Sequence, residues 1–303
     1  MPRNLKITLS YDGHDYHGWQ IQPGVPTIQG VLAEVIEGLT GERLLPQGSG
    51  RTDAGVHALA QVASFRTESR IPLENFKVVL NDRLPPSIRI LRVEEAAPEF
   101  HARHSARAKT YEYRIYRGEV CPPFLFHYVW HYPYPLNERA MAEAAARVVG
   151  QHDFTSFAAA DPDRAERLAL EESSATTMTT SADPAGEEET PALQRCGNVR
   201  TILESHLDSG SSAPRPGAKG SAPTPTNANA FAGDPAREHE LVYRVRGNGF
   251  LHHMVRNLVG TFMLVGKGTL KLEDLARILE ARERSAAGPT APAAGLCLVE
   301  VEY

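Results

Sequence analysis

Two long stretches that are poor in bulky apolar residues limit what this 303-residue chain can fold into. Residues 159–195 are rich in Ala, Glu, Ser, Thr and Asp, and residues 209–237 are rich in Gly, Pro, Ser and Ala. Neither stretch can bury enough apolar surface to offset the entropy lost on ordering, so we expect two disordered insertions. The core must therefore form from the rest of the chain, with residues 196–207 as a short structured island between the insertions.

The remaining segments carry strand-like and helix-like patterns of apolar residues. Ile7, Leu9 and Tyr11 alternate with polar residues, and so do Tyr111 and Tyr113, which is typical of half-buried strands. Such patterns predict strands at residues 6–11, 61–65, 88–95, 110–116, 240–250 and 296–303. Apolar residues at helical spacing predict helices at residues 27–41, 137–150, 249–266 and 271–283.

Strand-helix-strand order recurs on both sides of the middle of the chain. This order predicts an α+β protein with two similar sheet-based halves, residues 1–105 and 106–303, the second of which contains both insertions. Two predicted helices have recognisable ends. Gly41 is a plausible stop for the first, while Asn137 is a plausible N-cap and Gly150 a plausible stop for the second.

Charge is distributed unevenly along the chain, whose net charge is −5. Residues 161–195 hold nine acidic and three basic residues, so the acidity belongs to one segment. Residues 101–117 hold five Lys or Arg against one Glu, with two histidines besides. Phosphate contact depends on local patches of this kind and not on net charge, so a nucleic-acid partner remains compatible with the sequence.

Two further features set the expected compartment. No apolar run reaches the roughly 18 residues that a membrane helix needs, and the N-terminus lacks the apolar core of a signal peptide. Cys121, Cys196 and Cys297 are far apart and form no CxxC pair, so neither a disulfide framework nor a zinc site follows. We expect a cytoplasmic protein with idle thiols and no membrane association.

The segment GSGRTDAGVHALAQVASF (48–65) presents a carboxylate on a glycine-flanked turn before a strand. A dinucleotide-binding fingerprint needs a glycine where Asp53 stands, and aspartic proteases and glycosidases need a second carboxylate. Asp12 and Asp15 are candidates, but they lie in a turn where Asp commonly bonds the backbone. Asp53 with Arg51 is therefore either an ionised nucleophile with its counter-ion or a structural salt bridge.

The pair His252-His253 raises the question of a metal site. Adjacent residues on a helix point in different directions, and no third ligand is near in sequence, so we expect no metal. His252 and Arg256 are four residues apart and can form a polar stripe toward RNA or a cleft. Tyr111 is either a core residue of its strand or a ring that stacks on a base.

Taken together, six segments resemble the TruA-type tRNA pseudouridine synthases. GRTDAGVHA (50–58) is the most specific of these matches. The insertions depart from the family pattern, close to a loop that in the family lies near tRNA. The matching segments, in family order, are YDGHDYHGWQIQP (11–23), GSGRTDAGVHALAQVASF (48–65), FHARHSARAKTYEYRIY (100–116), HDFTSF (152–157), FLHHMVRNLVGTFMLVGKG (250–268) and TAPAAGLCLVEVEY (290–303).

The resemblance implies an enzyme that isomerises uridine to pseudouridine in the anticodon stem-loop of tRNA, at tRNA positions 38, 39 and 40. It implies two halves, each an antiparallel sheet with helices on one face, and an active-site cleft between them. It also implies a homodimer without metal or cofactor. Asp53 matches the catalytic aspartate, Arg51 the arginine that pairs with it, and Tyr111 the tyrosine that packs on the target base. The expected tRNA contacts are Phe100, His101, Arg103, His104, Arg107, His252 and Arg256.

The chemistry of the residues agrees with this expectation. An isomerisation consumes no second substrate, so it needs no dinucleotide, phosphate or metal site, but it needs the base out of the stack. The sequence leaves open whether Asp53 attacks the ribose, attacks the uracil ring or assists a proton shift. Two other functions remain as alternatives: an RNA-binding protein that has lost catalysis, and a hydrolase that releases free uracil.

Overall fold

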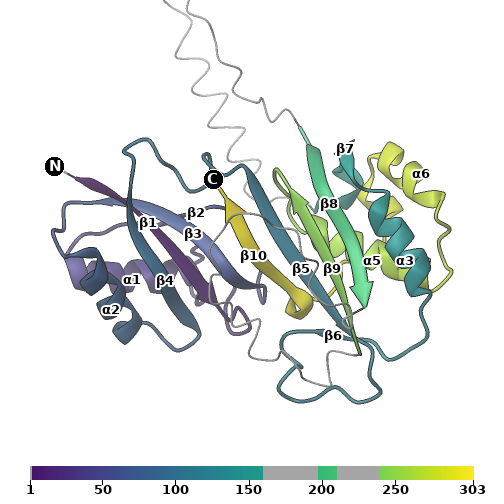
Figure 1. Cartoon of the computed structure of the whole chain (residues 1–303), viewed down its shortest axis with the longest axis horizontal. Coiled ribbons are helices and arrows are strands. Elements are labelled where there is room, and N and C mark those ends of the chain that lie inside the picture. Colours follow the sequence, from purple (N-terminus) through teal and green to yellow (C-terminus); the bar gives the residue numbers. More distant parts are fainter. Residues whose placement is uncertain (1, 160–196, 210–238) are drawn as a thin grey trace, which may run out of the picture.

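A computed structural model describes residues 2–159, 197–209 and 239–303 of the chain. Apart from Ala159 and Ser209, both predicted insertions lie outside the described residues. The described residues form two groups of helices beside one wide sheet (Figure 1). In that part of the chain, no helix is long and apolar enough to cross a membrane.

A single, mostly antiparallel sheet of ten strands runs through the described part of the molecule. Its main path has the order β4-β1-β3-β10-β5-β9-β8-β7, while β2 pairs with β3 and β6 pairs with β5. The strands are β1 Arg3–Tyr11, β2 Gln47–Gly48, β3 His57–Thr67, β4 Ile88–Ala96, β5 Ala108–Tyr116, β6 Trp130–His131, β7 Gly150–Asp153, β8 Val199–Ser209, β9 Glu240–Gly247 and β10 Leu296–Glu302. All strands expected from the sequence are present, and the predicted α+β class is confirmed.

The strand β10 joins the two sides of the sheet. It pairs in parallel with β3, with Leu298 opposite Ala58, and antiparallel with β5, with Leu298 opposite Tyr111. The strands of residues 1–105 therefore lie on one side of β10 and those from β5 onward on the other (Figure 1). The two halves were expected to contain one sheet each; in the structure their strands form a single sheet, with those of each half on its own side of β10.

The helices form two groups, one beside each end of the sheet (Figure 1). The first group is α1 Ile28–Thr40 and α2 Leu73–Arg83; the second is α3 Glu138–Ala146, α5 Met254–Gly266 and α6 Asp274–Ala281. The predicted ends of α1 are confirmed. The Thr27 side chain accepts a hydrogen bond from the Gly30 N–H, and Gly41 takes a left-handed conformation with φ of 75°.

Predicted boundaries of three helices are wrong, and the first of these is α6, which spans Asp274–Ala281 where residues 271–283 were expected. Asn137 caps α3 as expected, accepting a hydrogen bond from the Ala140 N–H at 3.0 Å, but the helix ends at Ala146 and not at Gly150. Gly150, with φ of 113°, begins β7 instead, because glycine adopts this backbone conformation without strain. The helix predicted for residues 249–266 begins only at Met254, which places His252 and His253 before it.

Candidate active site

The loop that carries Asp53 connects β2 to β3 and is fixed by its neighbours in the N-terminal part of the chain. The Trp19 N–H donates to the Thr52 carbonyl at 3.0 Å, and the Gly55 N–H donates to the Tyr16 carbonyl at 3.1 Å. Gly18 approaches the loop so closely that a Cβ there would lie 2.5 Å from the Thr52 oxygen. The backbone around Asp53 is therefore held before any substrate arrives.

Buried polar side chains hold the same loop from the sheet. The Lys109 ammonium, on β5, donates to the Ser49 carbonyl, and both residues are buried. The Gln61 amide, on β3, donates to the Gly50 carbonyl at 3.0 Å. Each bond pairs a backbone carbonyl that would be costly to leave unpaired away from water. These contacts hold the loop to β3 and to β5, the two strands on either side of β10.

Three nitrogen-bearing side chains from the start of α5 surround the Asp53 carboxylate, whose side chain is 16% exposed. The Arg256 Nη1 lies 3.0 Å from Oδ2, the His253 Nε2 lies 3.4 Å from Oδ2, and the His252 Nε2 lies 3.6 Å from Oδ1. Segments about 200 residues apart in the sequence thus meet at one carboxylate. The site combines a nucleophile candidate, a fixed cation and two groups that can carry protons.

His252 and His253 lie side by side because they precede the helix. His253 has φ of 59° and ψ of 4°, a left-handed conformation that is uncommon outside glycine. This conformation brings the two rings to a centroid separation of 4.0 Å with 36° between their planes. The prediction that adjacent residues here point apart, which rested on an uninterrupted helix, is therefore wrong.

Electrostatics distinguish His253 from an ordinary surface histidine. Burial lowers the pKa of the His253 imidazole below 6.5, the neighbouring His252 and Arg256 lower it further, and Asp53 opposes them. The neutral imidazole is thereby favoured at neutral pH. A neutral ring can accept a proton, and the lone pair of its unprotonated nitrogen can accept a hydrogen bond from a donor.

Arg256 is anchored independently of Asp53. Its Nε–H donates to the Ala291 carbonyl at 2.8 Å, and its side chain is 14% exposed. The next residue, Asn257, is fully buried, donates to the Phe157 carbonyl at 2.7 Å and accepts from Thr290. Three segments that are far apart in the sequence, around Phe157, Asn257 and Thr290, are therefore packed together. This packing orients the Arg256 guanidinium toward the Asp53 carboxylate.

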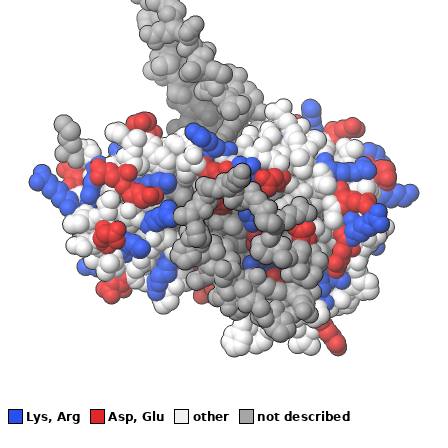
Figure 2. Space-filling model, in the orientation of Figure 1, with Lys and Arg blue, Asp and Glu red and all other residues white. Residues whose placement is uncertain are grey.

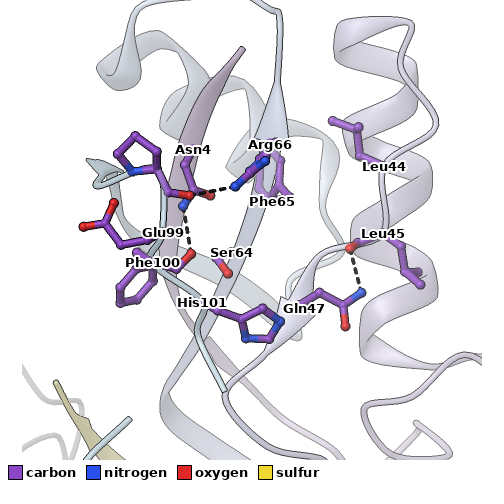
Figure 3. Close-up of a pocket in the computed structure, with 11 residues that line it drawn as sticks. Asn4, Leu44, Leu45, Gln47, Ser64, Phe65, Arg66, Glu99, Phe100 and His101 are labelled. Carbon is purple, nitrogen blue, oxygen red and sulfur yellow. Dashed lines mark hydrogen bonds between the residues drawn. The ribbon is translucent and has the colours of Figure 1, made fainter. Parts of the chain in front are cut away.

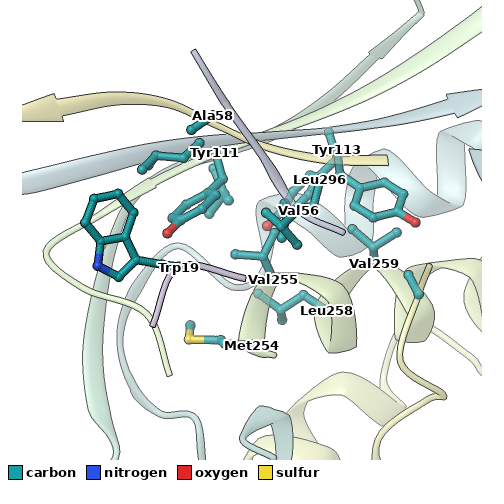
Figure 4. Close-up of a cluster of buried hydrophobic side chains, with 14 of the residues drawn as sticks. Trp19, Val56, Ala58, Tyr111, Tyr113, Met254, Val255, Leu258, Val259 and Leu296 are labelled. Atoms are coloured by element: carbon teal, nitrogen blue, oxygen red, sulfur yellow. The ribbon is translucent and has the colours of Figure 1, made fainter. Parts of the chain in front are cut away.

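The structure places Tyr111 at the centre of the sheet, 7% exposed, with Val245 and Leu298 as its strand neighbours. Its ring meets the Phe250 ring edge-on at 5.1 Å and lies among apolar side chains of α5 and β10 (Figure 4). Burial, with added repulsion from Tyr11 and Asp53, raises the pKa of the Tyr111 hydroxyl well above its ordinary value. Tyr111 is therefore a neutral, largely buried ring.

Arg51 and Arg256 are the two arginines to consider beside Asp53. Arg51 is exposed, and the arginine that the structure places within 3.0 Å of the Asp53 carboxylate is Arg256. Sequence spacing could not predict the contact between Arg256 and Asp53, because the two residues are separated by most of the chain. The pairing of Arg51 with Asp53 stays a prediction.

The other predicted tRNA contacts lie on the loop between β4 and β5. Phe100, His101 and Arg103 are half-buried, while His104 and Arg107 are exposed. Phe100 and His101 line a pocket of about 330 Å³ that β1 and β3 also line (Figure 3). The structure thus groups these five residues on the N-terminal side of the sheet, while His252 and Arg256 lie beside Asp53.

The basic residues of segment 101–117 do not all face solvent. Lys109 is buried beneath Ser49, Arg114 lies 3.9 Å from Glu112, and Arg117 lies within salt-bridge distance of an acidic side chain on α3. On the visible part of the face in Figure 2, basic and acidic residues are interspersed. Arg107 is exposed, and phosphate contact by this segment stays a prediction.

Asp12 is not available as a second catalytic acid. Its carboxylate accepts hydrogen bonds from the His14 N–H at 3.0 Å and from the Tyr128 hydroxyl at 2.6 Å. Hydrogen bonding with the His57 ring, followed by the bonds from Tyr128 and His14, holds the pKa of Asp12 well below its ordinary value. The expectation that Asp12 bonds the backbone of its own turn is confirmed.

Comparison with known proteins assigns the chain to a family. The sequence model of a family described as tRNA pseudouridine synthase matches residues 7–105 and 144–303. A protein named tRNA pseudouridine synthase A from Solibacter usitatus is 46% identical over 301 residues, which cover 99% of this chain and 100% of that protein. Its namesake from Moorella thermoacetica is 40% identical over 301 residues, with 99% of each chain covered. Because these matches extend along nearly the whole length, the chain belongs to the tRNA pseudouridine synthase family.

Proposed function

We propose that this chain isomerises uridines in the anticodon stem-loop of tRNA, at tRNA positions 38, 39 and 40, with Asp53 as the catalytic nucleophile. Membership of the family makes the chain an isomerase that acts on tRNA uridines. The observation that carries the finer proposal is the Asp53 carboxylate, held on a rigid loop and facing Arg256 at 3.0 Å. A fixed carboxylate beside a fixed cation is the arrangement that nucleophilic catalysis by an aspartate needs.

The reaction breaks the bond between ribose C1′ and uracil N1 and forms a bond between C1′ and uracil C5. The hydrogen on C5 leaves as a proton and N1 gains one, so atoms and electrons balance without a second substrate. A covalent adduct of Asp53 retains the reacting partners while the base turns. The target nucleotide must leave the stack first, because a carboxylate cannot reach the reacting atoms inside a paired helix.

The neighbours of Asp53 have distinct roles in this proposal. Arg256 stabilises the carboxylate and keeps its orientation, since its guanidinium is also bonded to the Ala291 carbonyl. Tyr111 supplies the ring against which the target base packs. His253, whose pKa is lowered by burial, is placed to exchange a proton with the reacting base.

Binding of the tRNA is proposed to use the loop between β4 and β5 together with the start of α5. Arg103, His104 and Arg107 contact phosphates, and Arg51 holds the site open after the target base leaves its stack. The proposal includes a homodimer in the cytoplasm, with each tRNA touching both subunits. Light scattering tests the dimer, and a molecular mass equal to that of a single chain would remove it.

The decisive experiment measures tritium release from tRNA that carries 5-tritiated uridine. Formation of the new carbon-carbon bond expels the hydrogen on C5, whereas RNA binding or glycosidic cleavage leaves it in place. We expect release by the wild-type protein and none by Asp53→Asn. Asp15→Asn is the matched control, because the Asp15 side chain is 88% exposed and lies in a neighbouring turn.

Each alternative function gives a different result in the same assay. A binding protein without catalysis retains tRNA but releases no tritium. A hydrolase releases free uracil, which chromatography detects. Replacing the uridine at tRNA position 38, 39 or 40 by cytidine tests the proposed sites, and unchanged release from the triple replacement contradicts the anticodon stem-loop assignment.

A further inference from the structure

We propose that Asp53, His252 and His253 form a binding site for a borderline-soft divalent cation such as Zn²⁺, and that the bound ion blocks the site. One oxygen of Asp53 and one ring nitrogen of each histidine all lie within 4.8 Å of one another. Among the residues that the structure describes, this is the group of His, Cys, Asp and Glu side chains with that property.

The separations of the donor atoms suit a tetrahedral ion. Ligand bonds of about 2.0–2.1 Å at the tetrahedral angle place neighbouring donors about 3.3–3.4 Å apart. The His252 Nε2 lies 3.6 Å from Oδ1 of Asp53, close to that edge length, while the His253 Nε2 lies 3.4 Å from the other oxygen, Oδ2. One carboxylate oxygen and one nitrogen of each ring all lie within 4.8 Å of one another, so the side chains must move closer together to complete three of four positions.

The two histidines converge because of an unusual backbone conformation, not because of sequence spacing. His253 adopts φ of 59°, a left-handed conformation that is unfavourable for a residue with a Cβ. The fold maintains this conformation, and the result is a pair of rings stacked 4.0 Å apart and directed at one carboxylate. The third donor comes from the loop before β3, so tertiary structure supplies the ligand that the local sequence lacks.

Exposure allows an ion to reach the donors. The His252 and His253 side chains are 35% and 28% exposed, while Asp53 is 16% exposed. The fourth position therefore faces solvent, where a water molecule can complete the coordination. Three protein ligands with one open position is the arrangement of exchangeable zinc sites and not of closed structural ones.

Arg256 determines how the ion shares the carboxylate. Its guanidinium stays at Oδ2, because its Nε–H is fixed to the Ala291 carbonyl. The ion takes Oδ1, which faces His252. Two imidazoles and one carboxylate favour Zn²⁺, Ni²⁺ and Cu²⁺ over Mg²⁺, which prefers oxygen ligands and retains its waters. The Mg²⁺ that accompanies tRNA is thus expected to leave the site free.

The test measures metal binding directly, by calorimetric titration of the full chain with Zn²⁺ and, separately, with Mg²⁺. We expect one equivalent of Zn²⁺ to bind and Mg²⁺ not to compete. His252→Gln and His253→Asn should each weaken the affinity for Zn²⁺ by at least about tenfold. Asn is chosen at position 253 because it tolerates a left-handed backbone better than other residues do.

A second histidine pair provides the matched control. The His101 and His104 rings lie 4.3 Å apart on the loop between β4 and β5. His101→Gln with His104→Gln should leave Zn²⁺ binding unchanged. The proposal is overturned if the variants at positions 252 and 253 bind Zn²⁺ as the wild type does, or if this control removes the binding.

Binding rests on geometry alone, whereas inhibition rests on the proposed role of Asp53. Zn²⁺ should stop tritium release by the wild-type protein, and a chelator should restore it. In His252→Gln, the fraction of that variant's own activity lost to Zn²⁺ should be smaller. Binding of Zn²⁺ without inhibition contradicts the role of Asp53 and keeps the metal site, so the two failures are distinguishable.

Discussion

Replacing Arg256 by Met tests how much the ion pair at the site contributes to stability. The change keeps most of the apolar stem and removes the guanidinium that lies 3.0 Å from Asp53. It also removes the donor to the Ala291 carbonyl, which belongs to a buried residue. Breaking a buried ion pair costs about 3–5 kcal/mol. Because the two side chains are 14% and 16% exposed, we expect the lower end, about 3 kcal/mol.

A surface ion pair of the same length provides the comparison. The Arg43 Nε lies 3.0 Å from Glu37, but the Arg43 side chain is 90% exposed. Water and salt screen such a pair, so Arg43→Met should cost less than about 1 kcal/mol. Urea unfolding at pH 7 measures both variants, and the difference between their midpoints at an unchanged m-value reports the effect of burial.

A double-mutant cycle with Asp53→Asn separates the pair from the other contacts of Arg256. We expect a coupling free energy between Arg256→Met and Asp53→Asn of about 2 kcal/mol, because each single change leaves the other charge half-buried and unpaired. A coupling below about 0.5 kcal/mol would refute this reasoning. It would mean that His252 and His253 compensate for the lost guanidinium, or that water reaches the carboxylate freely.

Four further expectations follow from single features of the chain. Gly260→Ala should destabilise the fold by about 1–3 kcal/mol, because a Cβ there would lie 1.7 Å from the Pro289 carbonyl oxygen. Gly38→Ala in α1, where the nearest atom is 3.5 Å away, should instead stabilise it by about 0.5–1 kcal/mol in the same urea assay. The pKa of His253 is lowered in the folded state, so the unfolded state binds more protons at this residue. The free energy of unfolding should therefore fall as pH drops through about 6.5. In His253→Asn, the dependence of the free energy of unfolding on pH should be weaker. Deleting residues 162–194 should leave tritium release intact, and loss of turnover in the deletion variant would contradict this.

The sequence predicted those parts of the fold whose signals are local. The helix α1 has six apolar residues at helical spacing between a threonine cap and a stop glycine, so its bounds were predictable to one residue. The helix α2 was missed because its signal is weak. Among its residues only Phe76 and Leu80 are buried, and Pro72, at its N-cap position, makes no side-chain capping bond.

The candidate site was predictable in its members but not in its pairings. The motif around Asp53 and the segment from His252 to Arg256 both stood out, but nothing in the sequence indicated that Arg256 contacts Asp53. The contact with Arg256 depends on how α5 packs against the loop before β3. The left-handed conformation of His253 could not be foreseen either, because such conformations are uncommon outside glycine and the apolar spacing here indicated a regular helix.

The position of β10 in the middle of the sheet affects the order in which the molecule can assemble during synthesis. Residues 296–302 supply the only strand of the described sheet that bonds both β3 and β5. Until they emerge from the ribosome, the edges of β3 and β5 stay open to other extended chains. The loop with Asp53 and the helix with Arg256 therefore cannot be locked into register until this segment is made. A nascent chain that stops short of residue 296 should accordingly be both inactive and prone to aggregation.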